Sequence, residues 1–443
     1  MSPNSQDIEL ISGLPRYSGG GRVSEAVYPC GTLLRYLNRD VPPEARMRVI
    51  ENASKDDFYI YREALMNAGF VPETQSRHEN NYFSVMALDR RRVYLSFMGN
   101  RARLSVIEDH LSRVSAGELS YDADGEQSGE FFMYGLNMDP GGYNTGPVAG
   151  TNEILNTSGY VNCGMLFAIR CCDGKIVVID GGHNSQFRGA AIDELDRFLH
   201  RIADKNIEQK VSVAAWFMTH SHNDHVDGFR MLLEKHGDKY ELERVLCNMP
   251  SAEICPTENK DPAIVNIARL IYENYPDCRE IKLHTGQRIR LADVTFDVLY
   301  THEDLVYSGE RRMSVGSYNN TSTVVKIMVG GMSILMLGDL DVPGEKRICA
   351  DYSEETLGSD IVQQAHHNWN HLSEIYRLAK APIACFAQTE EGTVKNEMAI
   401  ENSNEVKKYS TQLYYAGDIT RTVGFAKREG EIKLVYKYRA YLQ

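Results

Sequence analysis

The alternation of apolar and polar residues predicts a small first domain. The segment SKDDFYIYREALMNAGF has helical spacing, with Ser54 placed to cap its start and Gly69 to end it. The segments YFSVMAL, RVYLSFM and ARLSVIE that follow alternate like strands and are separated by turn residues. We therefore predict an α+β accessory domain over residues 1–120. Its first 30 or so residues, rich in Gly, Ser and Pro, are expected to form a flexible arm.

After this domain the pattern changes to strands that alternate with helices, which predicts an α/β domain over residues 121–443. The acidic stretch 117–130 is the expected linker, and the glycine-rich stretch 138–160 is expected to be a long loop, either functional or a surface excursion. Asp227 is expected to cap a helix that begins at GFRMLLEKHG. The other predicted helices are FRGAAIDELDRFLHRIADK, DPAIVNIARLIYENYP and HLSEIYRLAK, and the predicted strands are GMLFAIRC, KIVVID, VSVAAWFM, VTFDVLY, STVVKIMVG, MSILMLGD, IVQQA, QLYYAG, TVGFAK and IKLVYKY.

Composition narrows the class of partner. The chain has 61 acidic and 48 basic residues, which gives a formal net charge of −13. This balance disfavours charge-driven binding to extended nucleic acid or to an anionic membrane, but it permits a small anionic substrate held by a metal. The sequence shows no signal-peptide pattern, no apolar run of membrane-spanning length and no CxxC pair among its nine cysteines. We expect a cytoplasmic protein with a small-molecule substrate, and composition leaves a homo-oligomer open.

The stretch THSHNDHVDG concentrates metal-binding residue types directly after the predicted strand VSVAAWFM. His220 and His222 would point to one side if the strand continued, whereas a turn could bring Asp224 and His225 round to a second point. Three imidazoles and a carboxylate suit a pair of divalent first-row metals. The alternative, a polar loop with chance histidines, is disfavoured because four such residues occur within six positions.

The segment HSHNDH resembles the HxHxDH signature of the metallo-β-lactamase fold superfamily. Three further segments resemble elements of that family in the same order: KIVVIDGG with Asp180, MSILMLGDLD with Asp339, and DIVQQAHHN with His366 and His367. The resemblance covers residues 160–437. It implies an α/β fold, a four-layer αββα sandwich with metals at one edge, here preceded by the accessory domain.

The resemblance also implies a role for each motif residue. His220 and His222 would bind a first metal. Asp224 and His225 would bind a second, together with one of the pair His366 and His367, of which the family pattern favours His367. Asp339 would bridge the two metals, and Asp180 would orient the motif loop without binding metal itself. The implied cofactor is one or two divalent ions, with Zn favoured over Mn or Fe.

One part of the family pattern is missing. Many members carry another ligand histidine just before the strand that precedes Gly-Asp, but here Asn319 or Asn320 occupies that place in GSYNNTSTVV. This stretch, the His-His pair and the tail YYAGDITRTVGFAKREGEIKL instead resemble the metal-dependent domain of DNA-uptake competence channel proteins. The first metal is therefore expected to be held by fewer ligands or more weakly. His183 and His302 either line the pocket or lie in ordinary turns.

The chemistry implied by this resemblance is hydrolysis. A metal-bound water has a pKa of about 7, so a metal-bound hydroxide would attack the substrate, and Asp224 would orient it. Because the same chemistry serves phosphodiesters, lactones, thioesters and β-lactams, the fold does not choose a substrate. The competence-domain resemblance favours a phosphodiester of a small or nucleotide-like molecule. The alternatives are an ester or lactone hydrolase of small molecules, and a non-catalytic metal-binding interaction protein.

Overall fold

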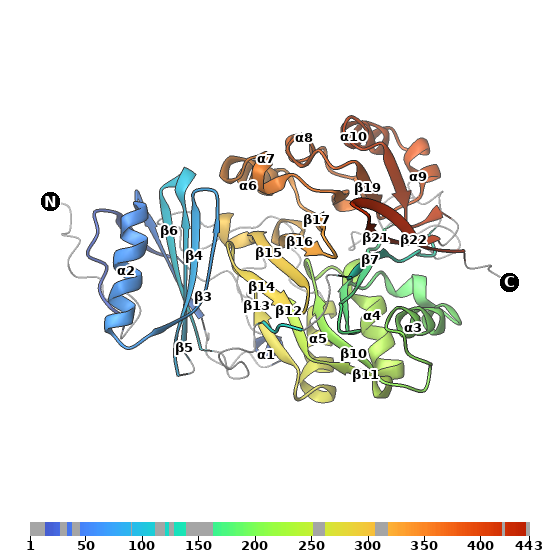
Figure 1. The fold of residues 1–443 in the computed structure, drawn as a ribbon, viewed down its shortest axis with the longest axis horizontal. Coiled ribbons are helices and arrows are strands. Elements are labelled where there is room, and N and C mark those ends of the chain that lie inside the picture. Colours follow the sequence, from blue (N-terminus) through green and yellow to red (C-terminus); the bar gives the residue numbers. More distant parts are fainter. Residues whose placement is uncertain are drawn as a thin grey trace.

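The computed structural model describes residues 14–26, 33–37, 45–89, 91–110, 120–123, 128–138, 163–250, 262–305, 318–418 and 421–439. In these ranges the chain forms three β-sheets, and Figure 1 shows the N-terminal sheet to one side of the two that follow. Half of the predicted linker 117–130, and all but the first residue of the predicted loop 138–160, lie outside the described residues. In the ranges given above, no helix is long and apolar enough to cross a membrane.

The N-terminal part comprises β1 (Arg22–Ala26), α1 (Leu33–Leu37), β2 (Ala45–Glu51), α2 (Lys55–Asn67), β3 (Val71–His78), β4 (Asn81–Leu88), β5 (Arg91–Met98), η1 (Gly99–Arg101) and β6 (Arg103–His110). Its six strands form an antiparallel sheet in the order β1-β2-β6-β5-β4-β3. The three predicted strands correspond to β4, β5 and β6, which pair as an antiparallel meander. The predicted helix corresponds to α2, where Ser54 and Asp57 form a capping box. The expected arm is wrong for residues 22–26, because β1 pairs with β2 and so satisfies its backbone hydrogen bonds.

The second sheet contains β7 (Glu130–Met133), β8 (Leu166–Arg170), β9 (Ile176–Asp180), β10 (Val211–Phe217), β11 (Tyr240–Leu242), β12 (Arg244–Cys247), β13 (Arg279–Lys282), β21 (Arg421–Arg428) and β22 (Glu431–Arg439). Its order is β13-β12-β10-β9-β8-β7-β21-β22, with β11 beside β10. The predicted strands GMLFAIRC and KIVVID correspond to β8 and β9, which pair antiparallel, and β10 runs parallel to β9. The helical segments between these strands are η3 (Asn184–Phe187), α3 (Ala191–Ile202), α4 (Asn223–His236), η4 (Gly237–Lys239) and α5 (Pro262–Asn274).

The third sheet contains β14 (Arg288–Leu291), β15 (Val294–Tyr300), β16 (Val324–Val329), β17 (Met332–Met336), β18 (Ile361–Gln363), β19 (Ile383–Phe386) and β20 (Gln412–Tyr415), in that order across the sheet. Its first four strands are antiparallel neighbours, and its last four run parallel. The helical segments are η5 (His302–Leu305), η6 (Tyr318–Thr321), α6 (Val342–Asp351), α7 (Glu354–Leu357), η7 (His366–Asn368), α8 (Glu374–Ala379), α9 (Glu390–Lys395) and α10 (Glu397–Lys407).

The second and third sheets face each other and share a core. Successive residues of β10 point to opposite faces: the Trp216 ring contacts Phe229 of α4, and the Phe217 ring contacts Phe296 of β15 at 6.0 Å between centroids. On the third sheet, Leu335 of β17 packs on the opposite side, in the cluster that includes residues of α6 and α8. Helices therefore cover the outer face of each sheet, and Figure 1 shows α6, α7 and α8 beside the third sheet.

The N-terminal sheet packs against this outer cluster rather than standing apart. Phe83 and Tyr94 share a buried cluster with residues of the third sheet and of α6. At the same contact, Arg101 Nη2 lies 2.6 Å from Asp304 Oδ1 and 2.8 Å from Asp351 Oδ2, and all three side chains are largely buried. Helix α6 begins three residues after Asp339. The N-terminal sheet therefore packs against a helix that lies next to one of the candidate metal ligands.

Candidate metal centre

The motif residues occupy the junction between β10 and α4. Thr219, His220 and His222 follow the strand, and His222 is the N-cap residue of the helix. Asp224 lies in the first turn of α4, where its charge complements the helix dipole. The structure corrects the predicted start of this helix. Because α4 begins at Asn223 and not at Gly228, its first turn presents Asp224 and His225. Asp227 lies inside α4 and is not its cap, and its carboxylate instead accepts from Arg230 Nε at 2.9 Å.

Four residues come together in a first group of candidate metal ligands: Asp224, His225, Asp339 and His367. His367 Nε2 lies 2.9 Å from Asp224 Oδ2, 3.4 Å from Asp339 Oδ2 and 3.1 Å from His225 Nε2. His225 Nε2 lies 3.2 Å from Asp339 Oδ1. Three of the four residues are buried, and Asp224 is at the boundary of burial with 13% of its side chain exposed. We call this group the Asp224 group.

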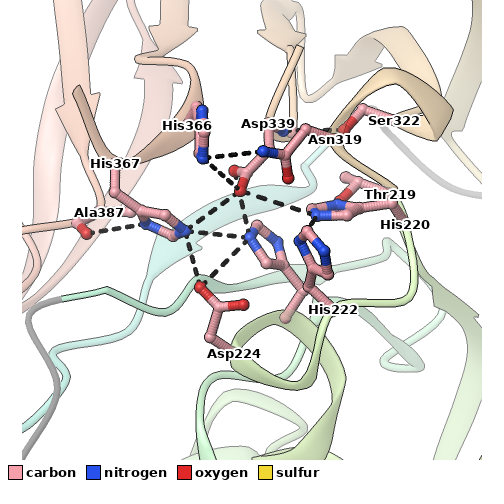
Figure 2. A network of polar contacts seen from close by, with 12 residues as sticks. Thr219, His220, His222, Asp224, Asn319, Ser322, Asp339, His366, His367 and Ala387 are labelled. Carbon is pink, nitrogen blue, oxygen red and sulfur yellow. Dashed lines mark hydrogen bonds and ion pairs between the residues drawn. The ribbon is translucent and has the colours of Figure 1, made fainter. Parts of the chain in front are cut away.

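A second group contains His220, His222 and Asp339, so that Asp339 is common to both groups. His220 Nε2 lies 3.0 Å from His222 Nδ1 and 3.7 Å from Asp339 Oδ2. Figure 2 shows these side chains directed toward a common centre, with Asp339 between the imidazoles of His220, His366 and His367. We call this group the His220 group. The residues that the sequence singled out therefore do assemble, at the edge where the second and third sheets meet.

Asp180 ends β9 in a left-handed conformation, with φ of 56°. Its carboxylate accepts hydrogen bonds from the Thr219 backbone N–H and the Thr219 hydroxyl, and it lies 2.8 Å from His225 Nδ1. The side chain is fully buried and is not a member of either ligand group. This position agrees with the orienting role that the sequence suggested, because a proton on His225 Nδ1 leaves Nε2 directed at the cluster.

The segment before β16 and the His-His pair meet at the rim of the His220 group. Asn319 Nδ2 lies 3.0 Å from His366 Nε2, and His366 Nε2 lies 3.8 Å from Asp339 Oδ2. Asn320 is buried in the same short helix, and its carbonyl accepts from the Tyr300 hydroxyl. The His222 ring contacts Tyr318 edge-on at 5.6 Å. The stretch 318–320 therefore lies beside the centre, with Asn319 in contact with His366 and Tyr318 in contact with His222.

The turn that carries Asp339 is closely packed against the motif strand. Gly338 has φ of 56°, and a Cβ atom there would lie 2.9 Å from Thr219 Cβ. Leu337 and Gly338 both donate their backbone N–H to Gln363 Oε1 at 2.7 Å, and the Asp339 N–H donates to Ser322 Oγ at 3.0 Å. Sequence reasoning missed Gln363 and Ser322. A glutamine in the otherwise apolar strand IVQ was the one available signal for Gln363.

Two further candidate histidines are buried but lie outside both groups. His183 caps η3, with its Nδ1 accepting from the Ser185 N–H at 3.1 Å, and its Nε2 lies 3.4 Å from Asn223 Nδ2 of the motif. His183 is thus a neighbour of the motif loop. His302 begins η5, whose next residue Glu303 contacts His284 at 3.0 Å. Neither histidine is brought into a set of candidate ligands.

The electrostatics of the two groups differ. Burial lowers the pKa of His225, but Asp339, Asp224 and Asp180 outweigh burial and raise that pKa well above its ordinary range. Burial also lowers the pKa of His367, but Asp339 and Asp224 outweigh burial and raise that pKa to about 9. Burial raises the carboxylate pKa values, but His225 and its neighbours hold those of Asp224 and Asp339 well below the ordinary range.

In the His220 group, burial and the neighbouring His225 lower the pKa of His220 well below its ordinary range. Burial likewise lowers the pKa of His366. The metal ions that this donor set suggests fit these residues. In each group two imidazole nitrogens lie 3.0 to 3.1 Å apart, and each group includes the buried carboxylate of Asp339. A divalent cation in each position would satisfy those nitrogens and carboxylates together.

Two facing sheets with helices on their outer faces, and two candidate ligand groups at the edge where the sheets meet, form the arrangement that the resemblance to the metallo-β-lactamase fold implied. The N-terminal antiparallel sheet is an addition to it. Among solved structures, the chain is similar to the metallo-β-lactamase fold protein YhfI from Bacillus subtilis, at 11% identity, with a TM-score of 0.35, over 65% of this chain and 95% of that one. It is also similar to Zn(2+)-bound PqqB from Methylobacterium extorquens, at 9% identity, with a TM-score of 0.37, over 66% and 99% of the two chains.

Sequence comparison gives one further finding. The chain matches no family model. It is 26% identical to ComE operon protein 3 of Bacillus subtilis (strain 168) over 153 residues. The matched segment is 34% of this chain and spans only 17% of the length of that protein. The similarity to ComE operon protein 3 therefore covers only part of each chain.

Proposed function

We propose that this protein is a metal-dependent hydrolase that acts on a phosphodiester of a small or nucleotide-like molecule. The observation that carries the proposal is the pair of ligand groups that share Asp339, at the edge where the two sheets meet. Two divalent ions held there would supply a hydrolytic nucleophile at neutral pH and polarise the substrate oxygens, a combination suited to in-line displacement at phosphorus. The residues assigned to the first ion are His220, His222 and Asp339; those assigned to the second are Asp224, His225, His367 and Asp339.

The donor set favours zinc, with manganese and iron as alternatives. Imidazole nitrogens outnumber carboxylates in the combined groups, and imidazole suits Zn and Fe, whereas carboxylate-rich sites suit Mn. Asp180 takes no part in binding an ion. Its contact with His225 Nδ1 fixes the imidazole so that Nε2 faces the cluster.

The role proposed for Asp224 is to hold a proton of the attacking water. One of its oxygens, Oδ2, lies 2.9 Å from His367 Nε2 and 3.8 Å from His225 Nε2. The carboxylate is the most exposed member of its group, so a substrate or water can approach it. The neighbouring imidazoles keep its pKa well below the ordinary range, and this keeps it an acceptor at neutral pH.

The size of the substrate is suggested by charge. A net charge of −13 disfavours the extended basic surface that binds a long nucleic acid. A small phosphodiester needs only the metal ions at the centre to balance its charge. The motif resemblance to the metal-dependent domain of DNA-uptake competence proteins supports a phosphodiester over other ester classes, because DNA is itself a phosphodiester.

The test is a substrate panel on the purified, metal-analysed protein. Hydrolysis of bis(p-nitrophenyl) phosphate, lost on chelation and restored by Zn²⁺ or Mn²⁺, is the expected result. His222→Ala should abolish it. His236→Ala, at the far end of α4, should not affect it. Turnover of lactones or carboxylic esters without phosphodiester turnover would identify a small-molecule esterase instead. Full metal loading with no turnover of any ester would identify a non-catalytic metal-binding protein.

A further inference from the structure

Three consecutive residues that are not glycine adopt left-handed backbone conformations at the end of β18. The φ angles are 47° at His366, 46° at His367 and 69° at Asn368. Such conformations bring Cβ too close to the backbone, and they persist only where the surrounding structure fixes them. A run of three at a cluster of candidate ligands therefore indicates that the turn has a positional role.

Helix α10 fixes this turn through buried amide groups. Asn368 Nδ2 donates to the Ala399 carbonyl and to Ser403 Oγ, both at 2.6 Å, and Asn402 Nδ2 donates to the Asn368 carbonyl at 2.6 Å. Asn368, Asn402 and Ser403 are all at most 2% exposed. On the other side, the His366 N–H donates to the Gly338 carbonyl at 3.1 Å, which links the turn to the one that carries Asp339.

The turn changes where two adjacent histidines point. In an extended strand, neighbouring side chains project to opposite faces, so only one of a His-His pair could reach the centre. Here both imidazoles approach Asp339: His367 Nε2 lies 3.4 Å and His366 Nε2 3.8 Å from Oδ2. Figure 2 shows both rings directed at that carboxylate, with His367 toward Asp224 and His366 toward Asn319.

His366 approaches the same oxygen of Asp339 as His220 does. His220 Nε2 and His366 Nε2 lie at nearly equal distances, 3.7 and 3.8 Å, from the same oxygen of Asp339. Asn319 Nδ2 lies 3.0 Å from His366 Nε2, so an ion bound by His366 would take the place of this amide at the single lone pair of Nε2. His366 is also the more exposed of the pair, with 21% of its side chain accessible against 4% for His367.

We propose that the left-handed turn divides its two histidines between the two metal positions. His367 serves the Asp224 group, and His366 supplies to the His220 group the third imidazole that the Asn319–Asn320 stretch does not provide. This inference rests on the proposed metal-dependent function, but it concerns ligands, so binding measurements test it without turnover. Asn402 and Ser403 act as positioning residues for both histidines through Asn368.

The experiment counts ions per chain and measures their affinities by chelator competition with Zn²⁺, with visible absorption of the Co²⁺ form as a second readout. Wild-type protein should bind two ions. His366→Ala should weaken one ion by about 10-fold or more, leave the other within a few-fold, and change the Co²⁺ spectrum. His367→Ala should weaken the other ion. The double variant His222→Ala/His366→Ala should lose no more ions than His222→Ala alone.

The positioning role is tested on one helix with a matched pair. Asn402→Ala removes the donor to Asn368, whereas Asn404→Ala removes an exposed amide from the same helix. Asn402→Ala should weaken both ions and alter the Co²⁺ spectrum at a temperature where the variant is fully folded; Asn404→Ala should not. Unchanged affinities in His366→Ala, or the loss of both ions in that variant, would overturn the assignment of His366. Two ions with the expected pattern but no hydrolysis would leave the ligand assignment standing and remove the hydrolase proposal.

Discussion

The two ligand groups share Asp339 but are built differently. The Asp224 group has four members, and two of its imidazoles are oriented by neighbours: His225 by Asp180, and His367 by the Ala387 carbonyl at 3.3 Å. The His220 group has three members, and the histidine expected from the resemblance is replaced by asparagine. The strand–helix junction supplies two residues to each group, so the groups differ in what distant turns add: Asp339 and His367 to the Asp224 group, and Asp339 alone to the His220 group. Each prediction below tests this contrast.

The largest effect is expected from Asp339→Asn, because this carboxylate belongs to both groups. Both ions should be lost, and hydrolysis of a phosphodiester should fall on the order of 10³-fold or more, since several kcal/mol of transition-state stabilisation depend on the ions. Elemental analysis and kcat/KM measure the two effects. Asp341→Asn, at the cap of α6, is the control. Retention of one tightly bound ion in Asp339→Asn would show that the two groups are independent.

Asp180→Asn should affect the groups unequally. The amide cannot accept the His225 Nδ1 proton as a carboxylate does, so the ion in the Asp224 group should bind about 10- to 100-fold more weakly. The ion in the His220 group should change much less. Chelator competition resolves the two affinities, with the exposed Asp277→Asn as a control. Equal weakening of both ions would contradict the contrast.

Metal binding to the two groups should depend differently on pH. Without a cation, the raised pKa values of His225 and His367, the latter about 9, leave these imidazoles protonated at pH 7. Protons must therefore leave when an ion enters the Asp224 group, and its affinity should rise as pH increases from 7 toward 9. His220 has a lowered pKa and is already neutral, so affinity in the His220 group should be nearly flat over that range. Calorimetry in buffers of different ionisation enthalpy measures the released protons; equal proton release from both positions would contradict this expectation.

The smallest effect is expected from Thr219→Val. The hydroxyl donates to Asp180 at 2.9 Å and lies 3.2 Å from His220 Nδ1. Removing it costs about 1 kcal/mol of hydrogen bonding, which corresponds to roughly a fivefold loss of affinity at the His220 group. Thr219→Ser keeps the hydroxyl and should bind like the wild type. A loss larger than that in Asp180→Asn would show that Thr219 is the main support of the loop.

The sequence predicted the parts of the centre that local patterns encode. The strand before His220 was visible as an apolar run, and the four ligands of the motif lie within six positions. The start of α4 was misplaced because apolar spacing begins at Val226, whereas His222 takes the cap and polar residues fill the first turn. The left-handed turn at His366–Asn368 was not predictable, since no glycine marks it and its support comes from α10, more than thirty residues later.

The short parallel strands β12 and β19, of four residues each, were also missed, because a buried four-residue run cannot be distinguished from part of a helix by periodicity. The packing of the N-terminal sheet against the outer side of the third sheet likewise could not be predicted from a local sequence pattern. It depends on contacts such as Arg101 with Asp304, which are about 200 positions apart.

Gly338 is a position in the metal centre where we expect no substitution to be tolerated. A Cβ atom at this position would lie 2.9 Å from Thr219 Cβ, and φ is 56°, so any side chain would both strain the turn and push apart the two strand ends that carry His220 and Asp339. Neither neighbour can retreat, because Thr219 is held by Asp180 and the Gly338 N–H by Gln363. In a saturation library, position 338 should therefore accept glycine alone, even though it offers no atom to an ion or a substrate.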